Sequence, residues 1–391
     1  MPDLSRRICG IVAGGDDGWG LYYRARAMQA SGKPVVMLSI GDHDIKTDAK
    51  ILAKMFESAE AGHLGYSNVA GLPALREAIA QRVMRTTQTP ARAENVALTP
   101  GGQGAIFAAM MSVLDPGDEC IVLDPFYATF DVTVRAASGT PVIVPTDAAA
   151  GFQPDPDVIR AAVTPATRAI LVNTPNNPSG AVYTRERLEA IAAICVEHDL
   201  WAISDELYDS QIHEGEHVSL RDLPGMAERT FQVGSMSKGY AMTGSRVGWV
   251  VAPEDAADRV IDLSGATQYG LPGFIQDAAV YALTECAEME ADVTARYRRR
   301  RDAALAALGN GSGLGVVPPG GGMYIMLDVR PTGLSGKAFA ERLLDEELIA
   351  VMPGESFGKA AAGHVRIALT VPEAELTDAM ARLASLAQRV H

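Results

Sequence analysis

One lysine of this sequence lies where an amine could do chemistry. Lys238 is in the segment Gly-Ser-Met-Ser-Lys-Gly at 234–239, directly after an apolar run that is typical of a buried strand. A surface lysine is the default interpretation, but small residues crowded around it indicate that a ligand approaches the backbone closely. Eight residues later, Arg246 precedes another apolar run, where a guanidinium suits a phosphate. Together they indicate a site for an anionic ligand.

Three further segments place polar or glycine residues where predicted strands end or helices begin. Asp205 and Tyr208 follow the apolar run 201–204, and the acid there is either a helix cap or a functional carboxylate. Asn177 lies in an Asn, Pro and Gly-rich segment that a plain turn would also explain. The glycines of 99–104 open a predicted helix, whose free N–H groups attract anions. Carboxyl ends of strands are where α/β sheets bind ligands, so these segments are candidates for one site.

The elements that position these residues alternate between strands and helices. Buried strands are predicted between residues 96 and 252, at 120–123, 142–144, 169–172, 201–204, 231–233 and 247–251, with helices at 103–114 and 185–198. This alternation favours an α/β fold with a mostly parallel sheet and helices on both faces. After about residue 275 the pattern changes to one long helix at 276–308, a strand at 323–329 and amphipathic helices at 335–347 and 373–388. The tail is therefore predicted to form a smaller α+β domain.

Composition restricts the class of partner and the compartment. The chain has 391 residues and a formal net charge of −14, which argues against a nucleic-acid or anionic-membrane binder because phosphate contacts need a basic face. There is no uncharged apolar run of about 18 residues, so no transmembrane helix is expected. The four cysteines form no C-x-x-C pair, which favours a reducing cytoplasm over a disulfide framework or structural zinc.

Three other segments resemble known functional motifs, but we do not assign those functions to this chain. The segment 213–217 matches the zinc motif H-E-x-x-H, but Gly215 disfavours a helix and no third ligand follows, so a surface hairpin is the simpler interpretation. The segment 235–238 matches S-x-x-K, but S-D-N and K-T-G partners are absent from the sequence. Five arginines at 296–301 would spread around a helix and are predicted to form a solvated or interdomain face. No metal site is predicted.

Taken together, the motifs resemble the fold-type I pyridoxal-phosphate-dependent aminotransferases of class I/II, in the manner of aspartate and aromatic aminotransferases. The resemblance covers nearly the whole chain from about Val35. It depends on Ser-x-Ser-Lys with an arginine eight residues on, Asn-x-Pro-Asn-Asn-Pro-x-Gly at 173–180 and Asp-x-x-Tyr at 205–208. Supporting segments are Gly-Tyr at 65–66, Gly-Leu-Pro-Ala-Leu-Arg at 71–76, Pro-Gly-Glu-Ser-Phe-Gly at 353–358 and Val-Arg-Ile at 365–367.

The resemblance implies a role for each catalytic side chain. Lys238 would form a Schiff base with pyridoxal 5'-phosphate and then act as the general base at the substrate Cα. Asp205 would pair with the pyridine nitrogen and keep the ring an electron sink. Tyr208 and Asn177 would hydrogen-bond the ring oxygen. Tyr127 would stack on the ring face, although a core aromatic is the alternative interpretation.

The resemblance also implies how the phosphate is held. Backbone N–H groups of Gly102 and Gln103 would bind it, and Ser235 and Arg246 would complete the cup. Tyr66 would reach the phosphate from the neighbouring subunit, which makes the active unit a homodimer.

For the substrate, Arg366 would clamp the α-carboxylate, with the backbone of Gly41 close by, and Asn177 beside it. Gln103 is neutral where acid-preferring relatives place a lysine, which weakens the case for a strict aspartate or glutamate donor. The side-chain pocket is expected to be apolar or aromatic, with contributions from Trp19, Tyr324 and Met323.

The predicted function is therefore transfer of an amino group from an L-amino acid to a 2-oxo acid by a ping-pong mechanism, in the cytoplasm. The donor is expected to be apolar, aromatic or broad rather than strictly acidic. A pyridoxal-phosphate-dependent C–S β-lyase is the alternative. The implied fold is a three-layer α/β/α large domain with a mostly parallel seven-stranded sheet, plus a smaller α+β domain. We expect an N-terminal segment at 1–45 that joins the small domain, a large domain at 46–285 and the small domain at 286–391.

Overall fold

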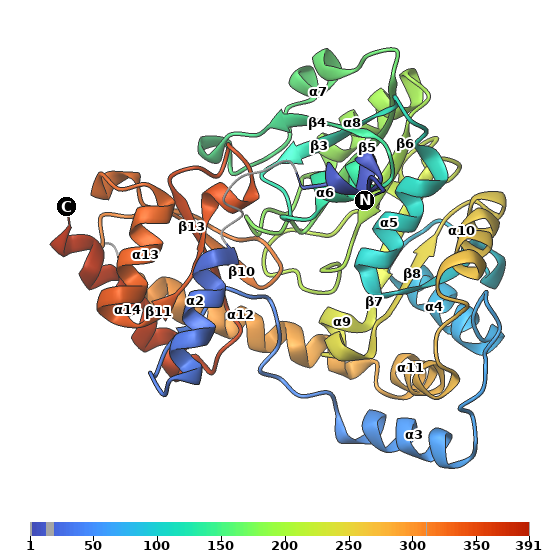
Figure 1. The fold of residues 1–391 in the computed structure, drawn as a ribbon, viewed down its shortest axis with the longest axis horizontal. Coiled ribbons are helices and arrows are strands. Elements are labelled where there is room, and N and C mark those ends of the chain that lie inside the picture. Colours follow the sequence, from blue (N-terminus) through green and yellow to red (C-terminus); the bar gives the residue numbers. More distant parts are fainter. Residues whose placement is uncertain (1, 13–18, 310, 391) are drawn as a thin grey trace.

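A seven-stranded sheet forms the centre of the larger part of the molecule (Figure 1). The computed structural model describes residues 2–12, 19–309 and 311–390. The strands run in the order β2 (Val96–Pro100), β8 (Val247–Val251), β7 (Thr230–Ser235), β6 (Trp201–Asp205), β5 (Thr167–Asn173), β3 (Glu119–Asp124) and β4 (Thr140–Pro145). Only β8 is antiparallel to its neighbours, so the predicted mostly parallel sheet is confirmed.

Helices cover both faces of this sheet because its strands carry apolar side chains on both sides. One face packs against α5 (Gly101–Val113), α6 (Phe130–Ala136) and α10 (Glu254–Thr267). The other packs against α7 (Pro156–Ala162) and α8 (Arg185–Glu197) over β3 and β5, and against α4 (Pro73–Thr86) and α11 (Gly273–Glu285) over β2 and β8. Helix α3 (Ala49–Glu60) lies against α11 at the lower edge in Figure 1. The α/β/α layering follows from this burial pattern.

The smaller part holds an antiparallel sheet in the order β12 (Met352–Pro353), β13 (His364–Ala368), β10 (Tyr324–Asp328) and β9 (Gly315–Val317). Helices α12 (Glu288–Leu308), α13 (Gly336–Glu347) and α14 (Glu373–Arg389) pack with it in one apolar core. The N-terminal strand β1 (Val36–Met37) pairs in parallel with β11 (Ile349–Ala350), and α2 (Trp19–Ala30) joins the same core. The early chain therefore folds onto the late chain, while the boundaries at 45 and 285 stay a prediction.

The structure differs from the sequence-based expectation between residues 276 and 308. Instead of one helix there are two, because α11 ends at Glu285 and α12 begins at Glu288. Cys286 leaves the helical region at φ −129° and ψ 33°, and its side chain is buried. From this break α12 runs across to the smaller part (Figure 1).

The segment 213–217 is not the surface hairpin that we expected. Only Glu214, Gly215 and Glu216 are exposed, while both imidazoles are largely buried. His213 Nε2 lies 2.7 Å from the carbonyl oxygen of Gly322, and His217 Nε2 lies 3.0 Å from Glu206 Oε2. The two rings therefore serve two separate contacts within the fold.

The arginine-rich stretch of α12 connects parts of the chain that are far apart in sequence. Arg300 forms a bidentate pair with Asp44 of the N-terminal segment, at 2.7 and 2.6 Å. Arg301 pairs with Glu214 at 2.9 Å. The Arg301 pair joins the predicted small and large domains, as the interdomain interpretation expects, whereas the Arg300 pair ties the N-terminal segment to the small domain that it joins. Within the described residues, no helix combines the length and the apolar character needed to cross a membrane.

Candidate active site

Three neighbouring parallel strands bring their last residues to one edge of the large sheet. Asn173 at the end of β5 pairs with Asp205 at the end of β6, and β7 ends beside them at Ser235. The short helix α9 (Met236–Gly239) starts there and carries Lys238. Because the strands are parallel, residues that are 30 or more positions apart reach the same place.

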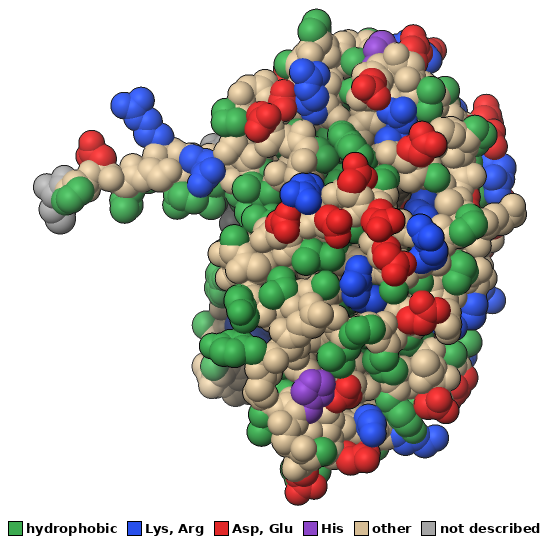
Figure 2. Space-filling view, turned by 90° about the vertical axis from the view of Figure 1, so that its right-hand side faces the viewer, with side chains coloured by type: hydrophobic (Ala, Val, Ile, Leu, Met, Phe, Trp, Pro, Cys, Tyr) green, Lys and Arg blue, Asp and Glu red, His purple; other side chains and the backbone are tan. Residues whose placement is uncertain are grey.

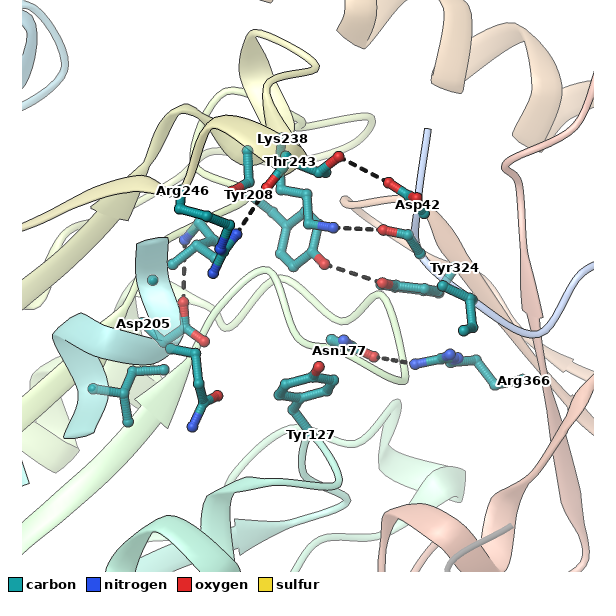
Figure 3. Close-up of a pocket in the computed structure, with 18 of the residues that line it drawn as sticks. Asp42, Tyr127, Asn177, Asp205, Tyr208, Lys238, Thr243, Arg246, Tyr324 and Arg366 are labelled. Atoms are coloured by element: carbon teal, nitrogen blue, oxygen red, sulfur yellow. Dashed lines mark hydrogen bonds between the residues drawn. The ribbon is translucent and has the colours of Figure 1, made fainter. Parts of the chain in front are cut away.

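A cavity of about 450 Å³ opens at this edge, between the two parts of the molecule (Figure 3). Ten of the twelve predicted site residues line it: Gly41, Gly102, Gln103, Tyr127, Asn177, Asp205, Tyr208, Lys238, Arg246 and Arg366. Ser235 and Tyr66 do not. The sequence-based grouping of these residues into one site is thus matched by their positions.

Lys238 points its amine into the cavity. Nζ donates a hydrogen bond to the carbonyl oxygen of Gly41 at 2.5 Å and lies 6.0 Å from the centre of the Tyr208 ring. There is no room for a side chain at Gly41, since a Cβ there would lie 1.8 Å from the Tyr324 hydroxyl oxygen. The N-terminal segment therefore approaches the amine through its backbone.

Asp205 places a carboxylate in the cavity in a strongly desolvated position. Burial raises its pKa to about 7, and the nearby Glu206 adds to the rise, against the lowering effect of the backbone N–H of Leu207, which lies 3.3 Å from Oδ1. Such a carboxylate is stabilised as an anion when a cationic group binds next to it. The site is therefore arranged to receive a positive charge at Asp205.

Two tyrosines bind each other across the cavity. The hydroxyl oxygens of Tyr208 and Tyr324 are 3.1 Å apart and their rings meet edge to face. Burial raises the pKa of Tyr208 well above its usual value. Tyr127 lies on another side of the cavity, with its ring edge-on to Phe130 at 5.7 Å. Burial also raises the pKa of the Tyr127 phenol, so Tyr127 and Tyr208 keep their protons.

The opening turn of α5 forms an anion-binding end of the cavity. Gly101 has a φ of +77°, and a Cβ there would lie 2.3 Å from the Arg246 guanidinium, so only glycine allows this approach. No side chain caps the helix N-terminus. Arg246, itself left-handed at φ +53°, donates to the carbonyl oxygens of Thr243 and Pro100 at 2.8 and 3.1 Å. Free N–H groups and one cation therefore converge there.

Arg366 forms the opposite end of the cavity. Strand β13 supplies it, and its guanidinium carbon lies 4.4 Å from the ring centres of both Tyr324 and Phe357. Nη1 donates to Asn177 Oδ1 at 2.8 Å and Nη2 to the carbonyl oxygen of Ser39 at 2.6 Å. Nε is buried without a hydrogen-bond partner. A buried guanidinium with an unmet donor suits a ligand carboxylate.

The expected side-chain pocket is partly correct. Trp19 and Tyr324 line the cavity, but Met323 is fully buried in the core of the smaller part. Met323 lies in the turn before β10, whereas Tyr324 is the first residue of that strand and lines the cavity. Gln103 is held by α6, because its amide donates to Thr133 at 2.8 Å and accepts from Thr129 at 2.8 Å.

The two remaining predicted residues lie outside the cavity. The Ser235 hydroxyl is bonded within the chain, to Ser237 Oγ at 2.8 Å and to the carbonyl oxygen of Val247 at 3.1 Å. Tyr66 is 92% exposed and packs edge-on against the exposed Tyr269 at 5.2 Å. The predicted contact of Tyr66 with the cofactor phosphate of a neighbouring subunit stays a prediction.

Asp42 and Thr243 are among the polar lining residues that sequence reasoning missed. Asp42 follows Gly41 and accepts a hydrogen bond from the Thr243 hydroxyl at 2.9 Å. The signal was present, since Asp42 is adjacent to a glycine that the resemblance placed at the substrate. Both residues line the same cavity as Lys238 (Figure 3).

This arrangement fits pyridoxal 5'-phosphate. The glycine-lined opening of α5 and Arg246 would hold the phosphate, where a Cβ at Gly101 would not fit. Asp205 would face the ring nitrogen, and Tyr208 and Asn177 would face the ring oxygen. Lys238 Nζ is the amine available to the aldehyde.

Comparisons with known proteins agree with this geometry. Residues 33–383 match the model of the family described as aminotransferase class I and II. The chain is 43% identical over 383 residues to the arginine–pyruvate transaminase of Pseudomonas aeruginosa, covering 98% of this chain and 96% of that one. It is 38% identical to the aspartate/prephenate aminotransferase of Thermus thermophilus, with both chains fully covered. A solved double mutant of Thermus thermophilus aspartate aminotransferase superposes with a TM-score of 0.93 at 36% identity, again over both full chains.

Proposed function

This chain belongs to the class I and II aminotransferases, which depend on pyridoxal 5'-phosphate, and we propose that it acts as a cytoplasmic homodimer with a broad donor range. It is an aminotransferase, so it moves the amino group of an amino acid to a 2-oxo acid. The proposal adds the site residues, the assembly and the compartment. The observation that carries the site assignment is that Lys238, Asp205 and Arg366 line one cavity at the carboxyl edge of the sheet.

When bound, the cofactor supplies an aldehyde that takes up the amino group and a ring that accepts electrons from the Cα–H bond. Lys238 Nζ is the base that would take the proton from the substrate Cα and pass it to the carbon of the bound aldehyde. Arg366 binds the α-carboxylate through Nε and an Nη group and thereby fixes the direction of the Cα–H bond. Asp205 would hold a positive charge at the ring nitrogen, and Tyr208 would face the ring oxygen with its phenol.

The neutral Gln103 supports a donor range that is not confined to acidic amino acids. Its amide is engaged by Thr129 and Thr133, and the cations that line the cavity within the described residues are Lys238, Arg246 and Arg366. All three have other proposed roles. A side-chain carboxylate therefore meets no free cation among the described lining residues, and we propose apolar, aromatic or mixed donors.

Exposed apolar side chains support the homodimer. Tyr66 and Tyr269 are exposed together, and Phe56 of α3 is 65% exposed. The arm at residues 2–12 projects from the body (Figure 2) and carries exposed Leu4 and Ile8. Exposed apolar groups of this size are typical of subunit contacts. The four free cysteines support a reducing compartment.

A panel of amino acids, each mixed with the cofactor-loaded enzyme without acceptor, tests the donor range. We expect the cofactor absorbance to convert with apolar, aromatic and other neutral donors, and to convert most slowly with aspartate. Conversion with aspartate alone would contradict the proposal. The C–S β-lyase alternative predicts pyruvate release from cystathionine, and no feature of the cavity favours it.

A further inference from the structure

Asp42 is the charged residue of the cavity that the amino-transfer roles leave unused. The charged side chains lining the cavity, within the described residues, are Asp42, Asp205, Lys238, Arg246 and Arg366. Four of them serve the cofactor or the substrate α-carboxylate in the proposed function. The carboxylate of Asp42 has no such role.

The carboxylate of Asp42 is only partly satisfied by its neighbours. Oδ1 accepts the Thr243 hydroxyl at 2.9 Å, and among the described residues no cationic group lies within ion-pair distance of Asp42. The adjacent His43 is half-buried, and its Nδ1 lies 2.9 Å from the Tyr297 hydroxyl oxygen. Burial lowers the pKa of His43 to about 4, so the ring is neutral at pH 7. An exposed, uncompensated carboxylate at a cavity attracts a cationic ligand group.

The position of Asp42 relates it to the substrate. The carbonyl oxygen of the preceding residue, Gly41, accepts a hydrogen bond from Lys238 Nζ. Asp42 is therefore adjacent in sequence to the residue that contacts the proposed catalytic lysine. Figure 3 places Asp42 on the side of the cavity opposite Tyr127, with its carboxylate pointing toward Thr243. Ile40 and Trp19 also line the cavity and give an apolar surface to the stem of a long side chain.

Building on the proposed aminotransferase function, we propose that Asp42 is a specificity-determining residue that favours donors whose long side chain ends in a cation. A guanidinium or an ammonium group on an apolar stem fits this chemistry. The proposal specifies the donor range further: uncharged donors are accepted, and a cationic one is preferred over a neutral isostere. A side-chain carboxylate would be repelled.

Arginine and citrulline form the test pair, because they have the same length and shape and differ in charge at the end of the side chain. We would measure kcat/KM for both with the cofactor-loaded enzyme. Since hydrogen bonds to charged groups are worth roughly 1.5–3 kcal/mol, we expect arginine to be favoured by about tenfold or more. Asp42→Asn should reduce this ratio to near one, and Asp42→Glu should keep a preference for arginine.

A binding measurement separates recognition from chemistry. 5-Guanidinopentanoate and 5-ureidopentanoate lack the α-amino group and cannot react, so calorimetry on the loaded enzyme gives their dissociation constants. The guanidino compound should bind about tenfold more tightly to wild type than to Asp42→Asn, while the ureido compound shows no such difference. Asp48→Asn is the control, because Asp48 caps α3 in the same segment, lies outside the cavity lining, and asparagine also caps helices.

The outcomes separate the two claims. If wild type uses arginine and citrulline equally, or if Asp42→Asn keeps the ratio, the role of Asp42 is refuted while the aminotransferase function stands. If none of arginine, citrulline, alanine and phenylalanine converts the cofactor, the proposed function itself fails.

Discussion

Arg366 Nη1 lies 2.8 Å from Asn177 Oδ1, and this bond joins strand β13 of the smaller part to the loop that follows β5 of the large sheet. Two residues that are 189 positions apart thereby share one side of the cavity. Asn177 is itself held in place, since its backbone N–H donates to Asn173 Oδ1 at 2.8 Å. The bond positions the guanidinium while leaving Nε free for a ligand.

Replacing Arg366 should mainly weaken donor binding. Losing one partner of a buried charge-assisted contact costs about 2–5 kcal/mol, so we expect kcat/KM for every amino donor to fall by about 30-fold or more in Arg366→Lys. Lysine keeps the charge but not the two-pronged geometry. Arg330→Lys is the control, because Arg330 pairs with Asp328 at the surface. Unchanged donor affinity in Arg366→Lys would remove that residue from the α-carboxylate site.

The raised pKa of Asp205 predicts how the stability of the cofactor-free protein changes with pH. Its pKa is about 7 in the folded chain, against ~3.9 for an unfolded aspartate. Between these values the folded protein keeps a proton that the unfolded chain has lost, so Asp205 lowers the free energy of unfolding as the pH rises. From pH 5 to pH 7 this effect amounts to about 2–3 kcal/mol.

The asparagine in Asp205→Asn cannot titrate, so this variant should not lose the stability that Asp205 costs the wild type between pH 5 and pH 7. The difference in the free energy of unfolding, variant minus wild type, should therefore increase by about 2–3 kcal/mol over this range. Urea unfolding at several pH values measures the difference. His43 and His213, whose pKa values are lowered to about 4 by burial, act in the opposite direction but equally in both proteins. Asp199→Asn, at an exposed carboxylate, is the control. Parallel curves for Asp205→Asn and wild type would disprove the desolvated state of Asp205.

Gly101 can be compared with Gly117, a glycine of similar backbone conformation where an added Cβ would contact no other residue. Both Gly101 and Gly117 have positive φ, +77° and +104°, but a Cβ at Gly117 meets nothing within 4 Å. Gly117→Ala should cost about 1–3 kcal/mol of stability and leave cofactor affinity unchanged. Gly101→Ala should in addition push Arg246 away and weaken cofactor binding by about tenfold or more, as measured by equilibrium titration. Equal cofactor affinity in the two variants would argue against an anion site at α5.

Hybrid dimers test whether Tyr66 acts across a subunit interface. We expect Tyr66→Ala to weaken cofactor binding and Lys238→Ala to abolish turnover. In a mixed dimer, the site that contains Lys238 would receive an intact Tyr66 from its partner, so it should bind cofactor normally and give up to about half of the wild-type activity. Mixtures without such recovery, or a monomeric protein in light scattering, would contradict the proposal.

Parallel strands explain why sequence patterns placed three candidate residues at one edge of the sheet. Asn177, Asp205 and Lys238 each follow an apolar run, and the carboxyl ends of such runs meet at one edge whatever the details of packing. Arg366 was placed through the family resemblance, since no local pattern brings β13 to β5. Such long-range contacts depend on the packing of the two parts.

The failures also have physical causes. The break between α11 and α12 has no proline or glycine, so the helical pattern continues through Cys286. His213 is buried and contacts a carbonyl 109 residues away, which no local pattern indicates. Asp42 was overlooked because it lies in an extended segment without a periodic pattern, and its relation to the cavity depends on Thr243. Residues whose role depends on a distant partner are the ones that local patterns miss.

Borohydride reduction of the cofactor-loaded enzyme tests the central claim most directly. Reduction should fix one pyridoxyl group per chain, and peptide mass mapping should find it on Lys238. Lys238→Ala should take up no label under the same conditions while keeping its fold. A label on any other lysine, or a wild-type enzyme that remains unlabelled, would contradict the account.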